Sequence, residues 1–338
     1  MTQIAPPIDA LTRSPQAPRR LTTVRDTGDR IFLAGTRFGA IAVVGIIACI
    51  GGFLAVRAYP ALAVDKFRFL TTQAWEPDIH HFGVAGVLTG TVLIAVVGLV
   101  VSTPVAIGLS LFISELAPEK MRRLLISLVD LMAAVPSVVY ALWGLDFFQG
   151  RILGVARWLA TWAGWFPLFH LGGAAAANPA GASTYSASIF VVGLVVSLMI
   201  MPIQCSVMRE AFSQAPLGER EGAFALGGTR WGMIRSVVLP FGKGGIVGGT
   251  MLAFGRALGE TIVVYLIISS TYGINWHILQ SGGSSISSLI ALQHGDADSF
   301  GIAALMAAGL TLFALTLLVN LAASAIITRS RSGAQSEV

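Results

Sequence analysis

Six long apolar stretches follow one another along the chain, at residues 31–56, 86–113, 124–146, 186–208, 245–270 and 300–327. Each is at least about 20 residues long, the length that a helix needs to cross the hydrocarbon core of a bilayer. Lipid offers no partner to a backbone N–H, so a spanning segment must bond its own backbone as a helix. The pattern therefore predicts an all-α polytopic membrane protein with six transmembrane helices.

Three longer segments separate these spans: an outer loop at 57–85, a segment at 151–185 and a loop at 209–243. The stretch 151–173 is itself long enough to cross, and in that case the loop 209–243 would change sides. Its tryptophans Trp158, Trp162 and Trp165 favour the headgroup region instead. We therefore expect an outer interfacial helix here, followed by a flexible Gly- and Ala-rich connector.

The charges add an orientation to this picture. Only 12% of the 338 residues are charged, against 55% that are hydrophobic, and the net charge is +5. Of the 22 Lys and Arg residues, sixteen fall on the tails and loops of one face and five on the other, with Arg256 inside a span. The positive-inside rule then places both termini in the cytoplasm. Basic residues that flank spans are orientation signals, so nucleic acid is not an expected partner.

Outside the transmembrane domain, 31–328, two polar tails are expected. Residues 1–30 are basic and rich in proline, which predicts a disordered cytoplasmic tail, and 329–338 form a short second tail. The first apolar run is too long for a cleavable signal peptide, so we interpret it as a permanent span. Cys49 and Cys205 belong to different spans at different depths, so no disulfide is expected.

Several catalytic and metal-binding patterns are missing from the sequence. It contains no G-x-x-x-x-G-K-[ST], no H-E-x-x-H and no G-x-S-x-G, so we expect no unaided nucleotide hydrolysis by this chain. The adjacent His80 and His81 point in different directions and make a poor chelate. We interpret them as surface histidines and expect no metal site.

The loop 209–243 carries the most informative spacing in the chain. Glu221-Gly222-Ala223 is followed after three residues by Gly227, and nine residues later by Val237-x-Leu239-Pro240. A basic amphipathic linker on the inner leaflet would account for the composition. The spacing, however, resembles the E-A-A-x3-G-x9-I-x-L-P signature of binding-protein-dependent ABC permeases. Gly222 in place of alanine and Val237 in place of isoleucine are the two departures.

The resemblance extends along most of the chain between the tails, except for the outer connector. The segments "GVLTGTVLIAVVGLVVSTPVAIGLSLFISELAP", "LMAAVPSVVYALWG", "MPIQCSVMREAF" and "GRALGET" together are similar to the C-type permease subunit of phosphate-specific ABC importers. "PSVVYALWG" and "RALGET" are the stretches most particular to phosphate permeases. The loop signature by itself indicates only an ABC importer.

This family resemblance implies a type I importer architecture and a set of partners. They are a homologous A-type permease subunit, two ATPase subunits that use ATP and Mg²⁺, and an extracytoplasmic phosphate-binding protein. The implied docking segment for the ATPase comprises Glu221, Gly222, Ala223, Gly227, Leu239 and Pro240. The chain itself would bind no cofactor and would form half of the pathway for inorganic phosphate. Pro104 and Pro136 are expected to kink the second and third spans.

Two charges inside the fifth span, Arg256 and Glu260, are the strongest candidates for the pathway. A charge at bilayer depth is unfavourable by about 3 kcal/mol. The residues are four apart, so a continuous helix would place them on one face, either as an ion pair that helps insertion or as a polar gate. The guanidinium suits a phosphate oxyanion, and the resemblance to phosphate permeases implies that transport depends on both residues.

The same charged residues are also consistent with a different class of protein. An ion-coupled secondary carrier or a membrane-embedded enzyme would use Arg256, Glu260 and Asp130 as proton-relay or catalytic groups. Such a protein would work without an ATPase, whereas an ABC permease would not. No residue pattern separates phosphate from sulfate on first principles.

Overall fold

The computed structural model describes residues 27–331 and is almost entirely helical within them. Contacts divide the chain after Ile50 into two units. The described part of the first unit is the beginning of α1, Thr27–Asp65, and the second unit contains the rest of the described residues. The predicted tails at 1–30 and 329–338 lie mostly outside the described residues. Thr27–Arg30 belong to α1, and residues 329–331 end the last helix, α15.

The first apolar stretch forms a longer helix than predicted, because α1 continues through residues 57–65 of the expected outer loop. Ala58 and Ala61 are fully buried there, in one apolar cluster with Ala304 and Ala308 of α15. Small side chains permit such close packing of helices and so favour the helical conformation. The remainder of the loop is compact. It comprises the 3₁₀ turns η2, Lys66–Leu70, and η3, Pro77–Ile79, and the antiparallel pair β1, Trp75–Glu76, and β2, His81–Phe82.

The remaining elements, in chain order, are α2 Ala85–Leu111, η4 Phe112–Leu116, α3 Glu119–Ala134, α4 Ser137–Trp143, η5 Gly144–Phe148, α5 Gln149–Trp162, α6 Gly173–Ala177, α7 Ala182–Tyr185, α8 Ile189–Ser213, α9 Leu217–Ala225, α10 Arg230–Met233, η6 Ile234–Val238, α11 Leu239–Phe241, α12 Lys243–Leu258, α13 Ile262–Ile267, α14 Ile286–Gln293 and α15 Ser299–Arg331. The elements η4, η5 and η6 are π-helical turns.

Four of these helices are long and apolar enough to cross a membrane: α1, α2 with η4, α8 and α15. Two bent helix pairs, Glu119–Ala134 with Ser137–Trp162 (89°) and Arg230–Phe241 with Lys243–Leu258 (63°), bring the number to six if each counts as one span. The predicted membrane fold is therefore confirmed, but two of the predicted spans are not single helices. The third, 124–146, is divided between α3 and α4, and the fifth, 245–270, between α12 and α13.

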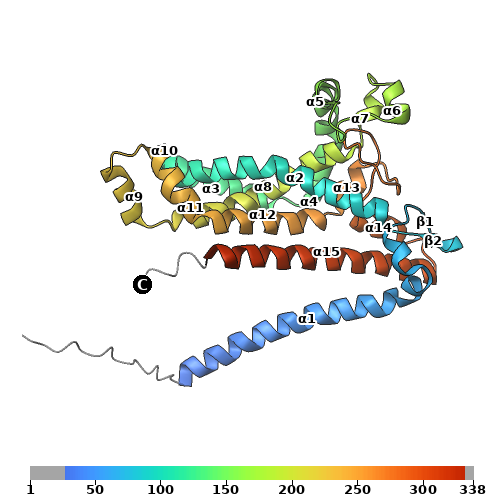
Figure 1. Ribbon diagram of the computed structural model, residues 1–338, viewed down its shortest axis with the longest axis horizontal. Coiled ribbons are helices and arrows are strands. Elements are labelled where there is room, and N and C mark those ends of the chain that lie inside the picture. The colour runs from blue at the N-terminus through green and yellow to red at the C-terminus, as the bar shows by residue number, and fades with distance from the viewer. Residues whose placement is uncertain (1–26, 332–338) are drawn as a thin grey trace, which may run out of the picture. The chain divides into compact units, whose positions relative to one another are not determined.

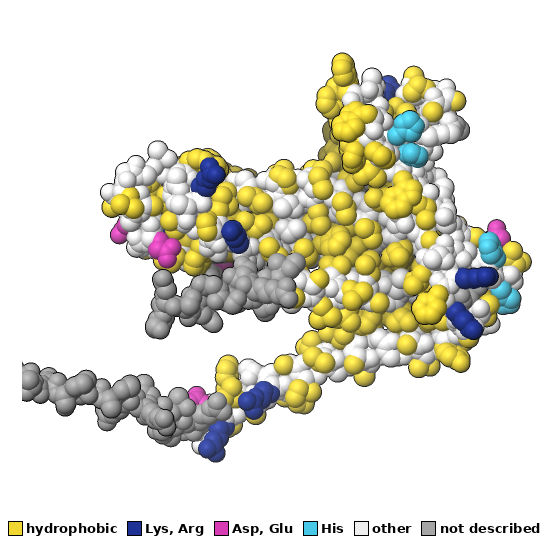
Figure 2. All heavy atoms as spheres, viewed as in Figure 1, with side chains coloured by type: hydrophobic (Ala, Val, Ile, Leu, Met, Phe, Trp, Pro, Cys, Tyr) yellow, Lys and Arg dark blue, Asp and Glu magenta, His cyan; other side chains and the backbone are white. Residues whose placement is uncertain are grey.

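Helix α8 is central to the second unit, packed along α2 on one side and α12 on another, while α15 packs against α12 (Figure 1). The short helices α9 and α10 lie at one end of this bundle and α5, α6 and α7 at the other. Hydrophobic side chains cover much of the bundle surface in Figure 2, and basic side chains gather towards the ends. This distribution is expected of a surface that faces lipid between two aqueous layers.

The N-terminal half of α2 contacts backbone directly, because two glycines remove the side chain from one face of the helix. A Cβ on Gly86 would overlap the carbonyl of Tyr272, and one on Gly90 would overlap the carbonyl of Ser284. On the same helix, the Thr91 hydroxyl accepts a hydrogen bond from the backbone N–H of Ile286 at 3.0 Å. The segment between α13 and α14 is thereby seated on α2.

The predicted flexible connector has more structure than its composition indicated. It contains α6 and α7, and the side chain of Tyr185 at the end of α7 is 1% exposed. Its hydroxyl donates to the backbone carbonyl of Pro179 at 2.9 Å. Burial raises the pKa of this hydroxyl, so it stays protonated as a donor, although nearby Arg157 lowers the pKa slightly. The aromatic anchor fixes a segment that glycine and alanine alone would leave loose.

Candidate functional site

The two charged residues of the fifth predicted span lie at a break between helices, not on one continuous helix. Arg256 is in the last turn of α12, and Glu260 is in the short link between α12 and α13. The expectation of a shared helical face is therefore wrong. Gly259 and Glu260 continue with longer bonds, both of 3.3 Å, from their N–H groups to the carbonyls of Gly255 and Ala257. Glycine is a poor helix former, which favours an ending here.

Glu260 is held by the start of the next helix. Its side chain accepts a hydrogen bond from the backbone N–H of Val263 through Oε1 at 3.3 Å, and only 7% of the residue is exposed. The first N–H groups of a helix have no partner within the helix, and a carboxylate there is stabilised by the helix dipole. The backbone carbonyl of Glu260 also accepts from the Ser287 hydroxyl of α14 at 2.7 Å.

Arg256, by contrast, is exposed and forms no ion pair with Glu260. Arg256 belongs to the last turn of α12, and the C-terminal end of a helix dipole favours a cation. The interpretation of the two residues as a self-neutralising pair is not supported by this geometry. Arg256 is left available for another anion.

Arg256 and Glu260 line the same open cavity, of about 690 Å³. Its other lining residues are Ile203 of α8, Leu252, Gly255 and Gly259 around the end of α12, and Thr316 and Asn320 of α15. Thr316 and Asn320 are four residues apart on one helix and were missed in the sequence. The Asn320 carboxamide lies close to α12, 3.9 Å from the position of a Cβ on Gly255. A lone asparagine within an apolar span is the signal that could have identified it.

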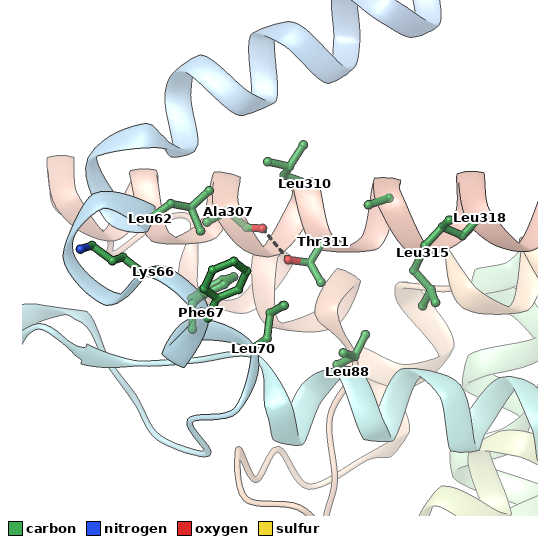
Figure 3. Close-up of a pocket in the computed structure, with 12 residues that line it drawn as sticks. Leu62, Lys66, Phe67, Leu70, Leu88, Ala307, Leu310, Thr311, Leu315 and Leu318 are labelled. Atoms are coloured by element: carbon green, nitrogen blue, oxygen red, sulfur yellow. Dashed lines mark hydrogen bonds between the residues drawn. The ribbon is translucent and has the colours of Figure 1, made fainter.

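A second hollow, of about 540 Å³, lies between the end of α1, α2 and α15 and is lined almost entirely by hydrocarbon (Figure 3). Leu62, Phe67, Leu70 and Leu88 point into it, and the Thr311 hydroxyl is bonded to the Ala307 carbonyl within its own helix. A groove of this kind suits acyl chains and offers no free donor to an oxyanion. The cavity at Arg256 is therefore the better candidate for a polar substrate.

The predicted docking segment in the loop 209–243 is built as a short helix with a defined stop. Glu221, Gly222 and Ala223 belong to α9, which ends in a Schellman motif: Gly227 N–H donates to Phe224 at 2.9 Å and Gly228 N–H to Ala223 at 3.0 Å. Gly227 has a φ of +79°, and a Cβ on Gly228 would lie 2.6 Å from the Ala223 carbonyl. Each of these two glycines is thus required for its own steric reason.

The helix α9 and the turn after it expose large apolar side chains. Leu226 is 91% exposed, Leu217 72% and Trp231 63%. Glu221 and Gly222 are exposed on the same element, and Leu239 and Pro240 follow in α11. Exposed apolar groups next to an acidic side chain are typical of a surface that another protein covers.

One contact of this loop was not predicted. Arg220, the residue before Glu221, forms an ion pair with Glu115 at the end of α2, with Nη1 and Oε2 3.1 Å apart. Nη2 also donates to the carbonyl of Phe212 in α8 at 2.6 Å. The residues are 105 positions apart, so no local pattern could have paired them.

The two prolines expected to kink their spans, Pro104 and Pro136, do not line the cavity at Arg256, and neither does Asp130. Pro136 is at the start of α4, where the axes of α3 and α4–α5 differ by 89°, and α2 continues through Pro104. Asp130 is exposed on α3 and does not line the cavity at Arg256. His80 stacks edge-on against Phe300, and no group of three His, Cys, Asp or Glu residues able to hold a metal occurs within 27–331.

A broken membrane span that presents an arginine to a cavity, together with an exposed loop helix at one end of the bundle, defines the class as a multi-pass membrane transport subunit. The chain belongs to the family of binding-protein-dependent transport system inner membrane components, whose family model matches residues 105–332.

Similar proteins indicate a narrower group within this family. The phosphate transport system permease protein PstC 2 of Mycobacterium tuberculosis is 38% identical over 304 residues, covering 88% of this chain and 91% of that protein. The PstC proteins of Pasteurella multocida and Mesorhizobium japonicum are 33% and 32% identical and cover 86% and 90% of this chain, and 88% and 92% of their own lengths. The resemblance drawn from the sequence is thereby confirmed.

Solved structures support the fold. A crystal structure of a bacterial alginate ABC transporter in complex with an alginate pentasaccharide-bound periplasmic protein matches with a TM-score of 0.54 and 17% identity, covering 89% of this chain and 95% of that chain. A second structure, of a bacterial ABC transporter involved in alginate import, matches with a TM-score of 0.50 and 19% identity, covering 89% and 99%.

Proposed function

We propose that this chain is one permease subunit of an ATP-driven importer of inorganic phosphate, and that the cavity at Arg256 is part of the translocation pathway. The observation that carries the proposal is an arginine that forms no ion pair among the described residues and lines a cavity together with Glu260 and Asn320, at a break in a membrane span. The chain's relatives are named as phosphate permeases. A guanidinium offers a planar fork of donors to a tetrahedral oxyanion.

Glu260 limits how tightly the anion is held. Its carboxylate is fixed by the N–H of Val263 and lines the same cavity, so it repels an anion bound at Arg256 without neutralising the guanidinium. The Thr316 and Asn320 side chains line the wall of α15. This combination suits a gate that an anion passes through better than a site where it stays.

ATP drives the cycle through partners. Two ATPase subunits that use ATP and Mg²⁺ dock on the segment that comprises Glu221, Gly222, Ala223 and Gly227, and Leu239 and Pro240 connect this segment to α12. Glu221, Gly222 and Gly227 form the exposed contact surface, whereas Ala223 packs against the membrane helices. A homologous A-type permease completes the pathway, and an extracytoplasmic phosphate-binding protein delivers the substrate. The chain itself is not catalytic and binds no cofactor. Pro104 within α2 and Pro136 before α4 supply the kinks at which these spans bend when α9 moves.

The experiment is uptake of labelled phosphate by the reconstituted complex of all these subunits. We expect Arg256→Gln and Glu260→Gln each to lower the initial ATP-driven uptake rate at least tenfold, and Arg256→Lys to lower it less, since the charge stays while the fork is lost. Arg123→Gln is the matched control, because this exposed arginine pairs with Glu119 within α3 and does not line the cavity. Near-normal uptake by both Gln variants would contradict the gate.

The same reconstituted complex tests which anion is transported and whether the chain is an ABC permease or a secondary carrier. Preferred uptake of sulfate over phosphate would overturn the substrate assignment. Gradient-driven uptake by the chain without its ATPase would favour the secondary carrier, for which the position of Asp130 away from the cavity offers no support.

A further inference from the structure

The ion pair between Arg220 and Glu115 is buried, although it lies in a loop region that is otherwise exposed. The Glu115 side chain is 4% exposed and that of Arg220 16%. The other ion pair of the described residues, Arg123–Glu119, is 79% and 66% exposed and joins residues of one helix. An exposed pair of that kind contributes little, whereas a buried pair fixes its two elements because neither charge can be left alone.

Arg220 joins three elements at one point. It belongs to α9, it donates to the Phe212 carbonyl near the end of α8, and it pairs with Glu115 in η4 at the end of α2. The helix α9 has no fully buried residue, and only Arg220 and Ala223 are partly buried, three residues apart on one face. This face is therefore the attachment of α9 to the membrane helices.

From this attachment a short path of packed elements leads to the cavity. Helices α2 and α8 pack against each other, and both pack against α12, whose last turn carries Arg256. Ile203 of α8 lines the cavity directly. A displacement of α9 that pulls on Arg220 is thus applied at once to α2 and α8, the two helices that pack against α12.

We propose that the Arg220–Glu115 pair is the mechanical link that converts movement of α9 on the ATPase into movement of α2 and α8. Both are positioning residues, since neither lines the cavity. The inference rests on the proposed function. An attachment that only held α9 in place would affect ATPase binding, whereas a link affects the amount of substrate moved per ATP hydrolysed.

The test measures phosphate imported per ATP hydrolysed in the reconstituted complex, together with co-purification of the ATPase. We expect Glu115→Gln and Arg220→Gln to retain the ATPase and its hydrolysis but to lower the ratio at least fivefold. Arg220→Lys should give an intermediate ratio, because one ammonium cannot serve Glu115 and the Phe212 carbonyl with the geometry of a fork. The exchanged pair Glu115→Arg with Arg220→Glu should recover at least half of the wild-type ratio.

Glu119→Gln and Arg123→Gln are the matched controls and should leave the ratio unchanged. An unchanged ratio in the single variants at the buried pair would overturn the proposal. So would loss of the ATPase from the Arg220→Lys and exchanged-pair complexes, since the pair would then only hold the docking helix. If the wild-type complex imports no phosphate, the proposed function itself fails; if it does and the variants match it, only the link fails.

Discussion

A helix end separates Arg256 from Glu260, although both charges belong to the same apolar run of the chain. Hydropathy counts apolar residues and is insensitive to a break of two or three residues in the hydrogen-bonding pattern. Here Gly259 and the capping carboxylate of Glu260 end one helix and start the next. The identity of the candidate residues could thus be predicted, while their relation to each other needed the backbone.

The turn after α9 gives a residue-scale prediction. Gly228→Ala should disturb the Schellman motif, because its Cβ would approach the Ala223 carbonyl to 2.6 Å. Gly227→Ala forces alanine to a φ of +79° at a cost of about 1–2 kcal/mol. We expect both variants to retain less ATPase in a co-purification assay at increasing salt.

Gly222→Ala is the control within the same helix. A Cβ there meets nothing within 4 Å, and alanine in a helix interior is favoured over glycine by about 0.5–1 kcal/mol. This variant should bind the ATPase at least as well as the wild type. Equal retention by all three variants would show that the shape of this turn does not matter for docking.

At the scale of elements, hydropathy located the apolar segments correctly but did not reveal that two of them are divided between helices. The third predicted span bends by 89° next to Pro136, and α3 alone has 16 residues, or roughly 24 Å, too short for the hydrocarbon core. Proline cannot donate a hydrogen bond and restricts the residue before it, so a break was physically available. Its angle depends on packing with α8 and α13 and could not be predicted.

The contact of α2 with the segment before α14 gives a prediction at this scale. Gly86→Ala and Gly90→Ala each introduce a methyl group onto backbone carbonyls that cannot move like a flexible side chain. We expect either substitution to lower the melting temperature of the purified protein, by at least several degrees for a destabilisation of about 1–3 kcal/mol. Gly108→Ala, farther along α2 with nothing within 4 Å, is the control and should not lower it. Unchanged melting of all three would mean that the two segments separate readily.

For the whole molecule, membrane character and family followed from the sequence, because hydropathy and motif spacing are carried by many residues at once. Long-range contacts such as the ion pair between Arg220 and Glu115 could not be predicted, because only the fold brings these two residues together. The connection between the docking loop and the membrane helices is of this kind. It is the part of the site that most depended on the structure.

Orientation is the whole-molecule prediction. Ser183 of α7 and Ser236 of η6 are both exposed, and Figure 1 shows α7 at one end of the bundle and α10, which directly precedes η6, at the other. In cells that carry Cys49→Ala, a membrane-impermeant thiol reagent should label Ser183→Cys from outside. Ser236→Cys should react only after the inner membrane is opened, because the positive-inside rule places the basic loop in the cytoplasm. The reverse pattern would contradict this topology, either because the whole chain is inverted or because residues 151–173 cross the membrane.

The break at Gly259–Thr261 also bears on how the chain is made. The helix α12 has only 16 residues and carries Arg256 in its last turn, and α13 after the break has only six residues. Neither helix would insert readily into a membrane by itself. The packing partners of α12, helices α2 and α8, precede it in the chain and are already synthesised when it emerges. Biogenesis should therefore be sequential, with the earlier helices acting as the template on which α12 and α13 are admitted to the membrane.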